Sequence, residues 1–242
     1  MISRADAQSF DRVAAEYDRL GELARVDHVG RWLDDVLPPA GGCALDLGCG
    51  SGRHAVLLAE RFGQVEAVDV SEPMIKLARR RRARPNISYR RADLHQVAGT
   101  GGYDFILSVL ALHHVPDLHA ALAHIRTLLA PDGRVVLMDM YEAGPVPLPR
   151  RVLQRIVPLR VRLHGLAAQA LVQDLVRRGP AVAWEVYRLS TGPWLDHRVS
   201  DRFFTRNELQ RACLEVFPGC ELRTCGGPRA IAVIWDAAAA MG

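Results

Sequence analysis

The feature that most constrains the fold is an apolar run, residues 43–47, that leads directly into a loop with glycine at every second position. The loop reads Gly48-Cys49-Gly50-Ser51-Gly52, and Asp46 stands two residues before it. Glycine permits a positive φ and lets a ligand approach the backbone without interference from a Cβ atom. In open α/β sheets, ligands bind outside the carboxyl ends of the strands, where the loop after the first strand forms the floor. The sequence therefore predicts a cofactor site at residues 48–52.

The spacing of these glycines selects among cofactor classes. A dinucleotide fingerprint G-x-G-x-x-G that begins at Gly48 needs glycine at position 53, where the sequence has Arg53. A phosphate loop ending in Gly-Lys-Ser or Gly-Lys-Thr is also missing from this segment. What remains is an acidic residue, three alternating glycines and a second acidic residue, Asp69, at the end of the next predicted strand. A carboxylate at that point can accept hydrogen bonds from both vicinal hydroxyls of a ribose.

Short apolar runs alternate with amphipathic stretches from residue 42 to about 140, which is typical of parallel strands joined by crossover helices. Pro131-Asp132-Gly133 is a turn signal that ends one helix and begins the fifth strand. Thr205-Arg206-Asn207-Glu208 is a capping box for a helix that continues to about residue 217. The expected strands are 43–47, 64–69, 87–91, 103–108, 133–139, 220–224 and 229–235, and the expected helices between the first five are 52–62, 73–84 and 118–129.

The resulting expectation is one α/β domain, residues 1–242, with a Rossmann-like sheet of seven strands that are mostly parallel. The last strand is expected to be antiparallel, and helices are expected on both faces of the sheet. The core comprises residues 42–143 and 201–236. Residues 1–41 are predicted to form an N-terminal helical lid, with its helical segment at about 6–37. Residues 144–200, interrupted by several prolines and glycines, are predicted to form a helical substrate cap inserted after the fifth strand.

Composition narrows the class of protein further. The sequence is 49% hydrophobic and 24% charged, which argues against disorder, and its apolar runs fall short of the length needed to cross a membrane. Five cysteines without a C-x-x-C pair suggest neither a disulfide framework nor a metal cluster, so we expect no metal and a cytoplasmic location. The net charge of +4 is diluted by 27 acidic residues, so nucleic acid is not an expected partner.

Six segments stand out along the chain, in the order Phe10-Asp11-x-Val13-Ala14-x-x-Tyr17-Asp18, Asp46 to Gly52, Val68-Asp69-Val70-Ser71-x-Pro73-Met74-Ile75, Ala92-Asp93-Leu94, Tyr103-Asp104-Phe105-Ile106 and Leu112-His113-His114-Val115. With these segments the sequence resembles the class I S-adenosylmethionine-dependent methyltransferases. Within that class it is similar to the small-molecule branch that includes the ubiquinone and menaquinone biosynthesis methyltransferases. The likeness covers residues 10–139 well and the remainder weakly.

The resemblance implies S-adenosylmethionine as cofactor and S-adenosylhomocysteine as product. It places the glycine loop beneath the methionine part, the Asp69 carboxylate on the ribose, and Val70 and Met74 on either side of the adenine. Each role has a structural alternative. The glycines could form only a tight turn, Asp69 could cap a helix, and Val70 and Met74 could belong to the core.

The resemblance also assigns residues that follow the third and fourth strands. Asp93 and the Leu94 backbone would read the adenine amino group and ring nitrogen, while Ser108 and Val109 would lie near the methionine amino group. Tyr17 would lie above the sulfonium, or would only anchor the N-terminal helix.

A hydroxyl acceptor must lose its proton, so a histidine near the methyl group is a natural general base at neutral pH. His113 and His114 follow the fourth strand and are the candidates, with His164 and His197 as competitors. The arginine run 79–82 is interpreted as a solvated helix end. The predicted function is methyl transfer to a small-molecule acceptor such as a secondary metabolite, at oxygen in preference to nitrogen or carbon. The alternatives are an RNA methyltransferase and a cofactor-binding scaffold without methyl transfer.

Overall fold

A computed structural model of the chain describes residues 4–24, 28–98, 102–142, 158–200, 203–225 and 229–240. The chain divides into two compact units. The first unit comprises Met1–Asp11, Asp27–Glu142 and Arg202–Gly242, and the second comprises Arg12–Val26 and Ala143–Asp201.

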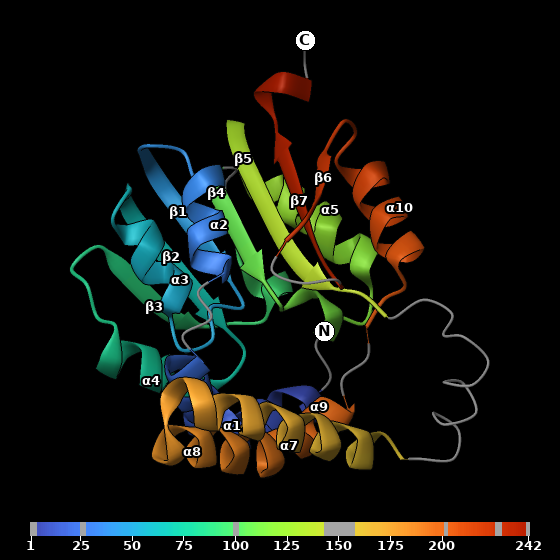
Figure 1. Cartoon of the computed structure of the whole chain (residues 1–242). Helices are drawn as coiled ribbons and strands as arrows, with labels where there is room; N and C mark the ends of the chain where they lie inside the picture. The colour runs from blue at the N-terminus through green and yellow to red at the C-terminus, as the bar shows by residue number, and fades with distance from the viewer. Residues whose placement is uncertain are drawn as a thin grey trace. The chain divides into compact units, whose positions relative to one another are not determined.

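A seven-stranded sheet forms the centre of the first unit, with the strand order β3-β2-β1-β4-β5-β7-β6 (Figure 1). The pairs from β3 to β5 are parallel, whereas β7 runs antiparallel to both of its neighbours. This arrangement confirms the predicted Rossmann-like α/β fold with its antiparallel last strand. The strands are β1 (Gly41–Leu47), β2 (Phe62–Asp69), β3 (Ile87–Arg91), β4 (Tyr103–Val109), β5 (Leu129–Met140), β6 (Glu221–Thr224) and β7 (Ala230–Asp236).

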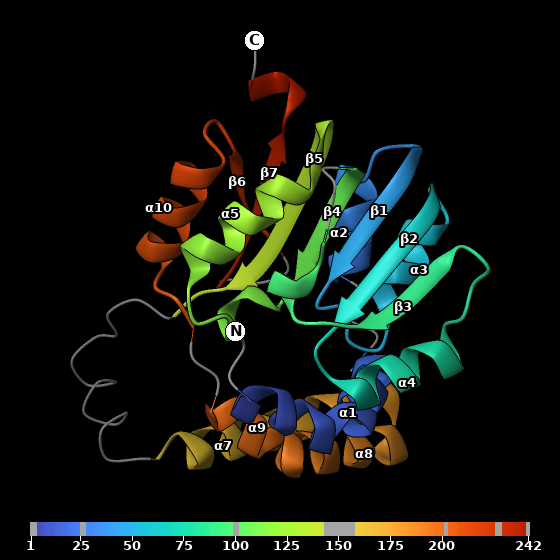
Figure 2. The same ribbon diagram turned by 180° about the vertical axis from the view of Figure 1, so that it is seen from behind.

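Helices cover both faces of this sheet, and each face has its own apolar core. On one face, side chains of α2 (His28–Val36), α3 (Arg53–Ala59) and α4 (Glu72–Arg81) pack against alternate strand residues. On the other face, side chains of α5 (Leu118–Leu128) and α10 (Arg206–Val216) pack against the sheet. Figure 2 shows these two helices in front of the sheet. The short 3₁₀ turns are η1 (Leu94–Gln96), η2 (Leu112–His114) and η3 (Ala238–Ala240).

The second unit is helical in its described residues. It contains α7 (Leu159–Arg178), α8 (Pro180–Thr191), α9 (Pro193–Ser200) and the part of α1 (Arg4–Ala24) that follows Asp11. Arg19 of α1 forms an ion pair with Glu185 of α8 at 2.8 Å, and Arg178 donates to the Leu23 carbonyl at 2.9 Å. Residues 144–157 of the predicted substrate cap lie outside the described residues.

Several predicted boundaries were wrong. The helices α3 and α4 end at Ala59 and Arg81, whereas the predicted helices continued to residues 62 and 84. Strand β5 begins at Leu129 and not at Gly133, because the register with β4 shifts between the pair Tyr103–Leu129 and the pair Phe105–Arg134. Residues 131–133, which were predicted to form a turn, therefore lie within β5 at this shift of register. In the N-terminal segment, which was predicted to be helical over about residues 6–37, the described residues form α1 and α2.

The capping box at residues 205–208 was predicted correctly. The Thr205 hydroxyl accepts the backbone N–H of Glu208 at 3.2 Å, and the Glu208 carboxylate accepts the backbone N–H of Thr205 at 2.8 Å. Among the helices of the described ranges, none combines the length and the apolar character that crossing a membrane requires.

Candidate active site

The glycine loop follows β1 at the carboxyl edge of the sheet and needs glycine for steric reasons. Gly48, Gly50 and Gly52 have φ values of 72°, 51° and 84°. A Cβ atom on Gly48 would lie 2.4 Å from the Cβ of Ala111, and one on Gly52 would lie 2.6 Å from the Tyr89 hydroxyl. The loop is therefore held close to the segment after β4 on one side and to β3 on the other.

Asp69, at the end of β2, is bound to this loop. Its Oδ2 accepts the backbone N–H of Gly50 at 2.8 Å, and its Oδ1 accepts the backbone N–H of Ser71 at 2.9 Å. Burial raises the pKa of Asp69 and the nearby Asp11 carboxylate adds to that rise, whereas the backbone N–H groups of Ser71, Gly50 and Val70 oppose it. The N-cap of α4 is Ser71, whose hydroxyl accepts the Met74 N–H, so the helix-cap alternative for Asp69 was wrong.

Asp46 lies beneath the same loop with only 1% of its surface exposed. Its Oδ2 has no hydrogen-bond partner among the described residues. Burial and the neighbouring Asp69 carboxylate raise the pKa of Asp46 to about 7, against a weaker opposing effect of the Ala55 backbone N–H. A buried carboxylate oxygen without a protein donor is costly unless a ligand or solvent supplies one, so this site suits a ligand with a cationic or N–H group.

The outer side of the loop is supported by β3 and the end of α4. Arg82 donates to the Ser51 carbonyl at 2.9 Å, and the Tyr89 hydroxyl donates to the Arg82 carbonyl at 2.9 Å. Arg79 donates to the Tyr89 carbonyl at 2.6 Å. Arg79, Arg80 and Arg81 are exposed in the last turn of α4, as the interpretation of a solvated helix end predicts. Arg79 and Arg82 have an additional role, because they bind backbone carbonyls.

The predicted adenine residues follow β2 and β3, which are neighbours in the sheet. Asp93 caps η1 by accepting the His95 N–H at 3.0 Å, and Leu94 is the first residue of that turn. Met74 is buried in α4 and Val70 is half-buried. Their burial is compatible both with adenine contact and with a core role, so the assignment to adenine stays a prediction.

The end of β4 is anchored to β1. The buried Ser108 hydroxyl donates to the Leu47 carbonyl at 3.1 Å, and Val109 is the last residue of the strand. Leu110, which follows, has a φ of 55°, and its N–H donates to the Met138 carbonyl at 2.8 Å. A leucine in the left-handed region stores strain, and such strain is concentrated at functional sites.

The structure pairs His113 with a residue that the sequence analysis did not single out, Asp139 of β5. His113 Nδ1 lies 2.7 Å from Asp139 Oδ1, and both side chains are buried. Asp139 also accepts the backbone N–H groups of His113 at 2.9 Å and Met140 at 2.6 Å. A carboxylate that already accepts two N–H groups acts as the acceptor for Nδ1 as well, which leaves Nε2 of His113 with the lone pair. The sequence signal that could have identified Asp139 is its position as an acidic residue near the end of β5, which pairs with β4.

His114 lies beside this pair. Its ring centroid is 3.9 Å from that of His113, and the Phe10 ring meets it edge-on at 5.0 Å. Phe203 contacts His113 in turn, with ring centroids 4.7 Å apart. The two predicted histidines are thus brought together inside an aromatic surrounding.

The other histidine and lid candidates belong to the second unit. The Tyr17 ring lies 5.1 Å from that of Trp194, which stacks on the buried His197 at 4.8 Å. His164 lies on α7. The placement of Tyr17 above a sulfonium stays a prediction.

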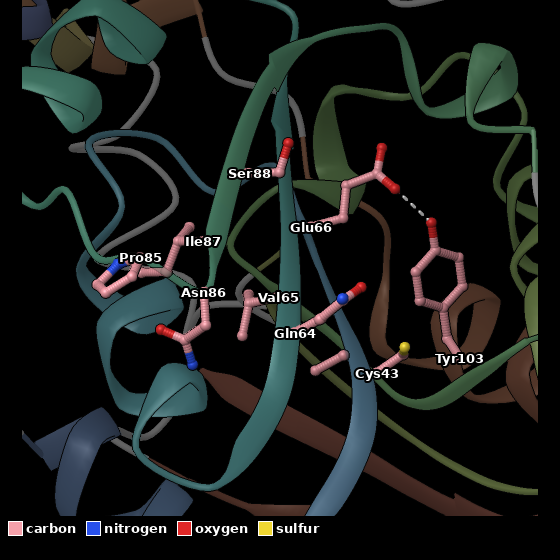
Figure 3. Close-up of a pocket in the computed structure, with 10 residues that line it drawn as sticks. Cys43, Gln64, Val65, Glu66, Pro85, Asn86, Ile87, Ser88 and Tyr103 are labelled. Carbon is pink, nitrogen blue, oxygen red and sulfur yellow. Dashed lines mark hydrogen bonds between the residues drawn. The ribbon is translucent and has the colours of Figure 1, made fainter.

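A separate cavity of about 490 Å³ lies at the opposite, amino-terminal ends of β1 to β4 (Figure 3). Two of its lining residues are paired, since the Tyr103 hydroxyl donates to Glu66 at 2.5 Å. Arg90, which does not line the cavity, donates to the other oxygen of the same carboxylate at 2.9 Å. Ligands of open α/β sheets bind at the carboxyl ends of the strands, so this cavity is not the candidate site. No cluster of three metal-ligating side chains occurs within the residues that the structure describes.

Comparisons with known proteins agree with this geometry. Residues 44–133 match the sequence family described as a methyltransferase domain. The chain is 31% identical over 184 residues to an aklanonic acid methyltransferase of a Streptomyces species, covering 71% of this chain and 81% of that protein. It is 34% identical over 174 residues to nocamycin O-methyltransferase of Saccharothrix syringae, covering 69% of this chain and 59% of that protein.

Coverage of the relatives is uneven. The chain is 35% identical over 112 residues to methyltransferases of Mycobacterium tuberculosis. This match covers 46% of this chain and only 57% of the length of those proteins. Among solved structures, the complex of DhpI with SAH aligns over 96% of this chain and 95% of its own, with a TM-score of 0.61. At 17% identity, that likeness shows the fold.

Proposed function

Because the chain belongs to the family of S-adenosylmethionine-dependent methyltransferases, we propose that it transfers a methyl group from that cofactor to a small-molecule acceptor. The proposal depends most on the contact between the glycine loop and the acidic end of β2, where Asp69 accepts the Gly50 N–H. In addition, Oδ2 of the buried Asp46 has no hydrogen-bond partner among the described residues.

The residues present fit the cofactor. The Asp69 carboxylate accepts backbone N–H groups from Gly50, Ser71 and Val70. A carboxylate has about four lone-pair sites, so Asp69 can still accept a hydrogen bond from a ribose hydroxyl. Asp46, whose Oδ2 has no hydrogen-bond partner among the described residues, precedes the glycine loop that would hold the methionine part of the cofactor. A cationic group of the cofactor near this oxygen would stabilise the ionised carboxylate. Val70, Met74 and Asp93 would enclose and read the adenine.

The bound cofactor would supply an activated methyl group on a sulfonium, so the protein need not form a covalent intermediate. The tasks left to this chain are to align the acceptor, to exclude water and to remove a proton. Ser108 and Val109, at the mouth of β4, would border the methionine part, and Tyr17 would cover the sulfonium.

The acceptor atom is proposed to be oxygen. This rests on the His113–Asp139 pair, because a buried histidine with Nδ1–H held by a carboxylate presents a basic Nε2 to a hydroxyl proton. After transfer the proton would remain on His113, and Asp139 would stabilise the resulting imidazolium. The relatives named for nocamycin and aklanonic acid support a small-molecule acceptor.

The test begins with calorimetric titration of the full chain with S-adenosylhomocysteine. It continues with incubation with methyl-labelled cofactor and extracts of small metabolites. We expect binding at one site and a labelled small-molecule product. Binding without product from any extract would favour the cofactor-binding scaffold, and lack of binding would contradict both readings.

A further inference from the structure

Phe10 and Asp11 open the first of the segments that carry the family resemblance, yet the proposed function gives them no task. Both lie on α1, in the part of the helix that belongs to the first unit. Asp11 Oδ1 accepts the Ser71 hydroxyl at 2.6 Å, and the Phe10 ring meets the His114 ring edge-on at 5.0 Å with an interplanar angle of 86°. Two adjacent residues thus contact the loop after β2 and the loop after β4.

The contact of Asp11 reaches the ribose carboxylate through one intermediate residue. Ser71 is fully buried, and its N–H donates to Asp69 while its hydroxyl proton goes to Asp11. A hydroxyl has a single proton, so the same oxygen accepts the Met74 N–H at 3.4 Å with a lone pair. The distance of 2.6 Å is that of a charge-assisted O–H···O⁻ hydrogen bond. Ser71 is therefore oriented by Asp11 on one side and orients Asp69 on the other.

The contact of Phe10 reaches the proposed base in the same indirect way. His114 lies between Phe10 and His113, with the two imidazole centroids 3.9 Å apart. An edge-on aromatic contact fixes the orientation of both rings more than a simple apolar contact does. Phe10 thereby limits the positions that the histidine pair can adopt.

We infer that Phe10 and Asp11 form a positioning pair. The pair fixes the segment that contains Ser71, after β2, relative to the segment that contains His114, after β4. This inference rests on the proposed function. Under that function, cofactor binding at Asp69 and proton removal at His113 both depend on the positions that Phe10 and Asp11 fix. Each residue of the pair acts through a neighbour, Asp11 through Ser71 and Phe10 through His114.

A readout that a merely structural role would not move is the pH dependence of cofactor binding. The titratable groups that face Asp69 are Asp11 on α1, Asp46 on β1 and Cys49 in the glycine loop. Burial raises the pKa of the Cys49 thiol, which therefore stays uncharged between pH 5 and 8. The ribose hydroxyls donate to the ionised Asp69, so binding weakens as pH falls through the pKa of Asp69. Asp11→Asn keeps an oxygen for the Ser71 hydroxyl but removes a like charge that raises this pKa, so the acid limb of binding should move to lower pH.

The experiment is calorimetric titration of the full chain with S-adenosylhomocysteine between pH 5 and 8, for the wild type, Asp11→Asn, Asp11→Ala and Phe10→Leu. Glu16→Gln, on the same helix, is the matched control for loss of a carboxylate. We expect Asp11→Ala to weaken binding about tenfold at pH 8 and Asp11→Asn to weaken it by less than about threefold while shifting the acid limb downward. Phe10→Leu should leave the Kd within about threefold and lower the rate of methyl transfer instead.

Hydrogen exchange separates this inference from the proposed function. In the absence of any ligand, Asp11→Ala should speed exchange of the amides of residues 71–75, which Glu16→Gln should leave unchanged. Equal binding, equal pH profiles and equal exchange for Asp11→Ala and Glu16→Gln would overturn the inference. Failure of the wild type to bind the ligand, with the exchange difference present, would instead contradict the proposed function and leave the Asp11–Ser71 contact supported.

Discussion

Gly50 donates its backbone N–H to Oδ2 of Asp69 at 2.8 Å, so the glycine loop after β1 is hydrogen-bonded to the acidic end of β2. Two residues that lie nineteen positions apart thus share a hydrogen bond at the carboxyl edge of adjacent strands. A change at either residue should therefore affect both the loop and the ligand that it holds.

Replacement of Asp69 should reduce cofactor affinity. Asp69→Ala removes the acceptors for the ribose and for Gly50, and should weaken binding of S-adenosylhomocysteine by roughly 1 to 3 kcal/mol. The matched control is Asp104→Ala, because Asp104 also accepts two backbone N–H groups, those of Gly42 and Cys43 at 2.8 Å each, but at the amino ends of the strands. Calorimetry that shows the same loss for both variants would refute the ribose assignment.

Replacement of Asp139 should reduce turnover while sparing the cofactor. Asp139→Asn no longer offers a charged acceptor to Nδ1 of His113, so the tautomer with a basic Nε2 loses its support. We expect kcat to fall by roughly 10²-fold to 10⁴-fold with the Kd for S-adenosylhomocysteine unchanged. Asp117→Asn, at the N-cap of α5, makes the same chemical change and should leave kcat as it is. An unchanged kcat in Asp139→Asn would remove the proposed base.

Glycine-to-alanine changes should have opposite effects at two positions. At Gly52, φ is 84° and a Cβ atom would lie 2.6 Å from the Tyr89 hydroxyl, so Gly52→Ala should destabilise the fold by about 1 kcal/mol or more and weaken cofactor binding. Gly165 lies within α7 with no atom within 4 Å of an added Cβ, so Gly165→Ala should stabilise by roughly 0.5 to 1 kcal/mol. Urea unfolding of both variants measures the contrast, and equal effects would contradict the loop geometry.

The stability of the ligand-free protein should depend on pH through Asp46. Its folded-state pKa of about 7 exceeds the ordinary value, so the folded protein retains a proton that the unfolded chain releases. The free energy of unfolding should therefore fall as pH rises from about 4 to about 7 and level off above that range. Asp46→Asn cannot ionise and should lack this part of the decline. Parallel curves of stability against pH for the two proteins would show that Asp46 does not titrate in this window.

Much of the fold was predictable from the sequence because it depends on local patterns. The apolar runs and the amphipathic stretches between them gave the strands of the first unit, and the capping box at Thr205 gave the start of α10. The start of β5 was not predictable. It depends on a register shift against β4, which is a property of the paired strands and not of residues 131–133 alone.

The candidate site was predictable only in part. The glycine loop and Asp69 are recognisable because their spacing is regular and the two strands are adjacent. Asp139 was missed because its contact with His113 spans 26 positions and arises only when β4 pairs with β5. The Asp11–Ser71 contact, across 60 positions, depends likewise on where α1 meets the sheet.

The most direct measurement is a crystal structure of the full chain with S-adenosylhomocysteine. We expect the ribose hydroxyls within hydrogen-bond distance of Asp69, and the homocysteine part over residues 48–52. A ligand bound elsewhere, or side chains filling the space above that loop, would contradict this expectation.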